Sequence, residues 1–151
     1  MQPHSSTRLS DAERMACATT AAFLRSVLGL RPMSLGVAAL SFAGLYLCSG
    51  ATVTLLFLGC FLATVPVLYL LFRVELDAGL FERLAAPEAG EEPLPSMDLA
   101  LLKLGLLKAV APRPLDDRLR GTRRLALRTL SLIAAQLVVL CVAVIVVASM
   151  K

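Results

Sequence analysis

The sequence predicts an all-α, polytopic membrane protein: a transmembrane helical hairpin, a third C-terminal span, and cytoplasmic amphipathic or interfacial helices. Two apolar runs carry this prediction. Residues 33–72 contain no Asp, Glu, Lys, Arg or His, and residues 129–150 contain Gln136 as their one strongly polar side chain. A bilayer core is about 30 Å thick and a helix rises about 1.5 Å per residue, so the first run crosses twice and the second once.

Composition and charge placement agree with a membrane protein. Apolar residues make up 58% of the chain and charged residues 17%, which is unusual for a soluble domain. Of the 15 Lys and Arg residues, 14 lie in 1–32 and 73–128. Basic residues stay on the cytoplasmic side of a span, which predicts a cytoplasmic N-terminus and central loop and an outside C-terminus. The membrane itself, bacterial inner membrane or eukaryotic endomembrane, stays open, and no nucleic-acid partner is expected.

The N-terminal segment, 1–32, is predicted to be cytoplasmic and to contain one amphipathic helix. Ser10 and Glu13 have the spacing of a capping box, which predicts that the helix begins there. Apolar residues then recur at helical spacing, a pattern typical of a helix that lies on a membrane surface. Pro32 separates this helix from the first span. The expected apolar face comprises Met15, Thr19, Ala22, Phe23, Val27 and Leu30.

The hairpin, 33–72, should turn at 49–52, where Gly50 tolerates a positive φ. Its first arm, 33–48, is short for a crossing and either borrows length from 28–32, thins the bilayer or stops short. The second arm, 53–72, has the full length. Pro66 removes one helical hydrogen bond and leaves the Leu62 carbonyl unpaired, so we expect a kink there, with Thr64 or a neighbouring helix replacing the bond.

Small residues on the spans, together with Gln136, are the candidates for helix packing. Two readings stay open for the small residues: packing within the hairpin, or an interface with a partner helix. For Gln136 they are a hydrogen bond to another helix, or a role in transport. The candidates are Gly36, Ala39, Ala43, Gly59, Ala63 and Gln136.

The cytoplasmic loop, 73–128, is divided by an acidic, proline-bearing linker at 87–95. An apolar stripe over 75–86 predicts one short helix, and the leucine-rich segment 97–110 predicts an interfacial helix. Asp116 and Asp117 favour a helix start, from which one helix can continue into the third span. Four arginines at the end of this loop are candidates for anionic lipid head groups or for a topological anchor: Arg120, Arg123, Arg124 and Arg128.

No catalytic, phosphate-binding or metal-binding motif occurs in the chain, so we expect no enzyme activity, cofactor or metal. The favoured function is that of an accessory, assembly or scaffold subunit that associates in the bilayer with lipids and with a membrane protein or a second copy. Two alternatives stay open. The uncharged hairpin with amphipathic flanks resembles the layout of reticulon-type proteins, which implies membrane shaping. A small pore or transporter of the phage-holin sort is the other, although the spans carry no ionisable residue.

Overall fold

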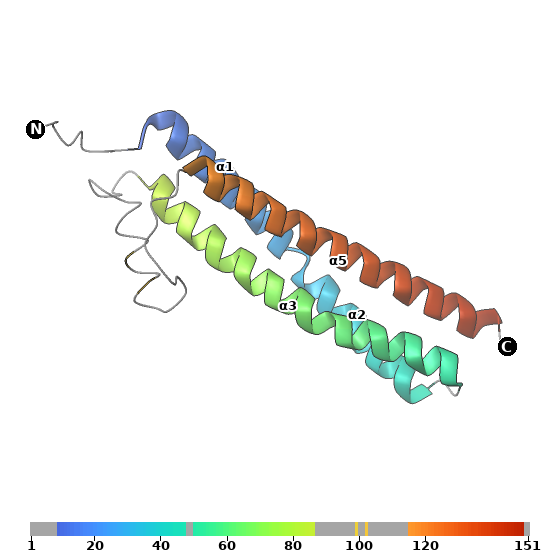
Figure 1. The fold of residues 1–151 in the computed structure, drawn as a ribbon. Helices are drawn as coiled ribbons and strands as arrows, with labels where there is room; N and C mark the ends of the chain where they lie inside the picture. Colours follow the sequence, from blue (N-terminus) through green and yellow to red (C-terminus); the bar gives the residue numbers. More distant parts are fainter. Residues whose placement is uncertain (1–8, 48–49, 87–98, 100–101, 103–114, 150–151) are drawn as a thin grey trace, which may run out of the picture.

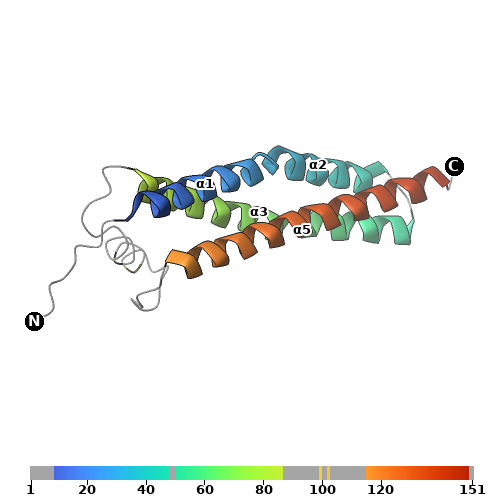
Figure 2. The same cartoon turned by 90° about the horizontal axis from the view of Figure 1, so that it is seen from above.

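The computed structural model describes residues 9–47, 50–86, 99, 102 and 115–149, and 95% of these residues are helical. Its helices are α1 (Asp11–Leu28), α2 (Arg31–Leu47), α3 (Ala51–Ala85) and α5 (Leu115–Ser149). They form three long rods that lie side by side, with α1 and α2 in succession along one rod (Figures 1 and 2). Each rod is long and apolar enough to span a membrane. The all-α prediction is therefore confirmed for the described residues.

The bundle has two chemically different ends. The charged end, as we name it, consists of α1, the part of α3 after Phe72 and the part of α5 before Thr129. The apolar end holds the charge-free parts of α2, α3 and α5. A helix of 35 residues is about 52 Å long, whereas a bilayer core is about 30 Å thick. Both α3 and α5 are therefore much longer than one crossing requires, and their excess length lies at the charged end.

The interior of the bundle follows a repeat of 3.5 residues. Buried positions alternate at spacings of four and three from Val53 to Phe81 in α3 and from Thr122 to Ala143 in α5, which is the spacing of a left-handed coiled-coil seam. Many of these side chains are small, which lets the helix backbones approach closely. In α3 they are Val53, Phe57, Cys60, Thr64, Val67, Leu71, Val74, Ala78 and Phe81. In α5 they are Leu115, Thr122, Ala126, Thr129, Ile133, Gln136, Leu140 and Ala143.

Helix α1 begins as predicted, but it buries a different face. The Ser10 hydroxyl accepts a hydrogen bond from the Glu13 amide, and the Glu13 carboxylate accepts one from the Ser10 amide at 2.8 Å. Met15, placed on the expected apolar face, is 69% exposed. The buried side chains share one core cluster with α3 and α5, and they are Cys17, Ala21, Leu24 and Val27. The bundle interior therefore uses the face of Cys17 and Leu24, and the contact of the Met15 face with a membrane surface stays a prediction.

The two turns at either end of α2 explain its limits. Gly29 and Leu30 form a turn between α1 and α2. The two helices continue in nearly the same direction and together form one rod of 37 residues. Pro32 lies in the first turn of α2, where its missing N–H has no helical partner to lose. The predicted separation of the two helices is present, but it lies at Gly29 and Leu30, two residues before Pro32. At the other end Gly50 has φ 142°, which confirms its expected role in the turn.

Helix α3 continues well beyond the predicted second span. It runs unbroken through Pro66 and on to Ala85, so 75–86 is the end of α3 and not a separate short helix. The prediction that one helix leads from Asp116 into the third span is confirmed by α5. The predicted linker at 87–95 lies outside the described residues, as does the helix at 97–110 apart from Leu99 and Leu102.

Gly44 provides a test of the packing between α2 and α3. A Cβ atom added at Gly44 would lie 2.6 Å from ring carbons of Phe57, whereas one added at Gly36 would meet nothing within 4 Å. We predict that Gly44→Ala destabilises the purified chain by about 1–3 kcal/mol through overpacking. Gly36→Ala, the matched control, should be neutral or stabilising by up to about 1 kcal/mol. Thermal unfolding in detergent measures both, and equal melting temperatures for the two variants would contradict this contact.

Candidate functional site

A polar bridge joins α3 and α5 inside the charge-free part of the bundle. The Gln136 side chain is 3% exposed, and its amide donates hydrogen bonds to the Thr64 hydroxyl at 2.7 Å and to the Cys60 carbonyl at 3.1 Å. The thiol of Cys60 points back to the Gln136 carbonyl at 3.5 Å. The backbone carbonyl that accepts from Gln136 is that of Cys60. The Leu62 carbonyl, whose helical donor is missing because residue 66 is proline, does not accept this bond. The expected bond from Gln136 to another helix is thus present.

The interior near this bridge contains polar atoms that lack hydrogen-bond partners among the described residues. They are the Gln136 Oε1 atom and the hydroxyls of Ser34 and Ser41. The contact of Gly44 with Phe57 sets the antiparallel register, so Ser34 and Ser41 lie about one turn on either side of the level of Thr64 and Gln136. Serine hydroxyls can rotate to the carbonyl four residues back in their own helix. The Gln136 oxygen has no such local donor.

The small residues predicted to pack within the hairpin mostly face outward. Gly36, Ala39, Ala43 and Gly59 are exposed in this chain and Ala63 is half-buried. The packing reading within the hairpin is therefore wrong for the first four. Helical spacing places Gly36, Ala39 and Ala43 on the side of α2 opposite to its buried residues. The small residues on the buried face of α2 are Ser34, Ser41 and Gly44. The 3.5-residue repeat, and not residue size alone, is the sequence signal that identifies them.

A groove of about 670 Å³ separates α3 from α5 at the charged end. Such a volume is in the range of small-molecule sites. Its apolar lining includes Phe81 and Leu84, both buried in the core. The charged lining consists of four arginines and two aspartates, namely Arg73, Arg118, Arg124, Arg128, Asp77 and Asp117.

One wall of the groove is tied to the other by a hydrogen bond. The Thr122 hydroxyl of α5 donates to the Asp77 carboxylate of α3 at 3.2 Å. Asp77 lies beyond Phe72, where the charge-free part of α3 ends. Burial raises the pKa of the Asp77 carboxyl, while the bond from Thr122 and the positive charge of Arg73 act in the opposite direction.

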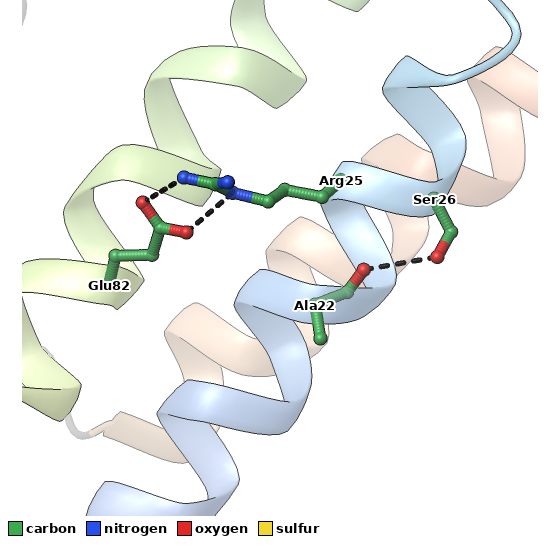
Figure 3. A network of polar contacts seen from close by, with 4 residues as sticks. All are labelled: Ala22, Arg25, Ser26 and Glu82. Atoms are coloured by element: carbon green, nitrogen blue, oxygen red, sulfur yellow. Dashed lines mark hydrogen bonds and ion pairs between the residues drawn. The ribbon is translucent and has the colours of Figure 1, made fainter.

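The other side of α3 has its charges paired. Arg25 of α1 bonds Glu82 at 2.7 Å, beside a Ser26 hydroxyl that is bonded within its own helix to the Ala22 carbonyl (Figure 3). Arg31 of α2 bonds Glu75 at 2.6 Å. All four charged side chains of these pairs are well exposed, and such pairs are worth about 0–1 kcal/mol each. These pairs therefore add little to the free energy of unfolding, and their main effect is on the register of α1 and α2 against α3.

Only two of the four arginines predicted to bind lipid head groups line the groove. Arg124 and Arg128 line the groove, whereas Arg120 and Arg123 are exposed and do not line it. Sequence reasoning missed Arg73 and Asp77, which come from α3. No spacing within α5 could reveal them, because the groove forms only when two helices far apart in sequence pack together.

No group of three or more His, Cys, Asp or Glu side chains in the described residues is placed to hold a metal ion. The chain matches none of the protein-family models, curated proteins or solved structures with which it was compared.

The bridge at Gln136 can be tested by a double-mutant cycle. Gln136→Leu removes both hydrogen bonds and should lower the free energy of unfolding by about 0.5–2 kcal/mol. Thr64→Val removes one partner, so the two substitutions together should cost less than the sum of the single ones. The control pairs Gln136→Leu with Ser131→Ala, because Ser131 bonds only within α5. Unfolding of the purified chain in mixed micelles measures the cycle, and additive losses at Gln136 and Thr64 would refute the bridge.

Proposed function

We propose that the protein acts without catalysis, as an accessory, assembly or scaffold subunit that associates with another membrane protein through the outward face of α2. The observation that carries this proposal is the position of the small residues of α2. Gly36, Ala39 and Ala43 leave the bundle interior and face the outside. In a bilayer, small residues on an outer face allow a second helix to approach closely.

None of the described helices packs on this face, because Gly36, Ala39 and Ala43 are all exposed. The interior contact of α2 is already filled where Gly44 meets Phe57, and a side chain at Gly36 would extend into open space. Leu40 and Leu47 flank the small residues and are 62% and 84% exposed. A stripe of small side chains beside large apolar ones suits an apolar helix of another membrane protein or of a second copy. We favour a different membrane protein, as for an accessory subunit.

The orientation of this subunit is also a proposal. We place the charged end in the cytoplasm and the end of α5 outside, because basic residues near span ends are retained on the cytoplasmic side. Arg73 and Arg128 directly follow and precede the charge-free parts of α3 and α5. Both spans therefore carry their positive flank at the same end of the bundle, which supports a single orientation for the whole chain.

Membrane shaping has less support from the geometry. A wedge needs an apolar helix face that is free to enter one leaflet. The buried side chains of α1, among them Leu24 and Val27, lie in the cluster that also contains Phe81 and Leu84 of α3, whereas Met15 of α1 is exposed. Phe81 and Leu84 belong to the apolar stripe predicted for 75–86, and their burial leaves them unable to enter a leaflet.

The proposal predicts that enlarging the outward face of α2 releases the partner without unfolding the bundle. Gly36→Leu combined with Ala43→Leu should lower co-purification of the partner in mild detergent about tenfold or more, since the backbones can no longer approach. The melting temperature of the isolated chain should not fall. The matched control is Ala134→Leu with Ala148→Leu, which enlarges exposed positions of α5. Cross-linking in the native membrane, read by mass spectrometry, identifies the partner.

Equal partner recovery with both double variants would contradict a role for this face of α2. Deformation of liposomes by the wild-type chain alone, with no partner recovered, would favour membrane shaping instead.

A further inference from the structure

We propose that the groove between α3 and α5 binds one anionic phospholipid, whose phosphate is held between Arg73 and Arg128. This inference requires that the bundle spans a membrane, but it does not depend on a protein partner. It differs from a general attraction of basic residues to lipid, because it assigns binding to particular arginines from two helices and excludes others on the same helix.

The first step is the level of the two arginines along the bundle. Thr64 is bonded to Gln136, and Asp77 is bonded to Thr122, so α3 and α5 run antiparallel in a fixed register. Arg73 follows Thr64 by nine residues in α3. Because the helices are antiparallel, the residue of α5 at the same level is nine residues before Gln136, at position 127, next to Arg128. Arg73 and Arg128 therefore stand at nearly the same level, on opposite walls of one groove.

The second step is where that level lies. Arg73 directly follows Phe72, the last residue of the charge-free part of α3, and Arg128 directly precedes Thr129, where the charge-free part of α5 begins. The mouth of the groove thus lies where a bilayer core gives way to head groups. Phosphates of the adjacent leaflet are found at this depth, and a guanidinium binds a phosphate with two parallel hydrogen bonds.

The third step is charge. Arginines outnumber aspartates four to two in the lining of the groove. Arg25 and Arg31, on the other side of α3, are already paired with Glu82 and Glu75. Within the described part of the chain, neither Arg124 nor Arg128 forms a salt bridge. The groove therefore carries positive charge that is not neutralised within its own walls.

The shape of the groove favours a lipid head group over a flat electrostatic contact. Its lining includes Leu125, about one turn from Arg128, while Phe81 and Leu84 line the part of the groove two to three turns beyond Arg73. Beyond the two arginines, the groove extends toward Thr122 and Asp77. The hydroxyls of a glycerol or sugar head group would find hydrogen-bond partners there.

Native mass spectrometry of the full chain in detergent tests this assignment. Wild-type protein is titrated with phosphatidylglycerol and, separately, with phosphatidylcholine of the same acyl chains. We expect tighter binding of phosphatidylglycerol, and about twenty-five-fold weaker binding in Arg73→Gln with Arg128→Gln, since each basic residue contributes a factor of about five. The matched control, Arg120→Gln with Arg123→Gln, removes the same charge from α5 outside the groove and should change affinity less than about threefold.

Several outcomes would overturn the proposal. Equal losses in the two double variants would mean general electrostatic attraction, and equal binding of both lipids would mean no selectivity for anionic head groups. Displacement of the lipid by millimolar inorganic phosphate would assign the groove to a soluble phosphate ligand. If the glutamine variant unfolds, Arg73→Lys with Arg128→Lys replaces it, because it keeps the charge but loses the paired hydrogen bonds. Unchanged affinity in the lysine variant would then refute binding by the two guanidinium groups.

Discussion

The seam of small and branched side chains along α3 is the constraint on which the rest of the structure depends. This one helix packs both against the rod of α1 and α2 and against α5, and its buried positions keep a 3.5-residue repeat from Val53 to Phe81. A strict repeat of this kind holds the same face toward the neighbours only if the helices supercoil to the left. Because the repeat does not stop at Phe72, the bundle continues past the apolar segment as one body.

The sequence predicted the helices better than their contacts. Charge-free runs depend on composition alone, so the spans, the turn at Gly50 and the capping box at Ser10 could all be predicted from local patterns. The inner faces could not, because the interior selects side chains by their fit to a neighbouring helix. Cys17 and Ala21 are buried while the larger Met15 is exposed.

The same limit applies to the candidate sites. Gln136 was identifiable because an amide in an apolar run needs a partner in another helix. Gly36 and Gly44 look alike in sequence, yet only Gly44 contacts Phe57. The groove could not be predicted from local sequence patterns, since Arg73 and Arg128 are 55 residues apart and line the same groove only because α3 and α5 pack in this register. Patterns within one helix cannot supply that register.

The two proposed interactions use different parts of the bundle. The outward face of α2 lies in the apolar end, whereas the groove lies at the charged end between α3 and α5. Gln136 is buried away from both surfaces. A lipid in the groove and a helix on α2 would therefore not compete for space, and each can be removed by substitutions that leave the other intact.

The central claim is that α1 packs on α3 as part of the bundle and does not lie apart on the membrane surface. Intrachain cross-linking in liposomes tests it most directly. Cysteines replace Arg25 and Glu82, whose side chains meet in Figure 3, in a chain whose native cysteines are replaced by alanine, and a short bismaleimide is added. We expect efficient cross-linking within one chain, and much less when the cysteine is moved from position 25 to Ser26. Failure to cross-link Arg25→Cys with Glu82→Cys, while both cysteines react singly with maleimide, would contradict the account.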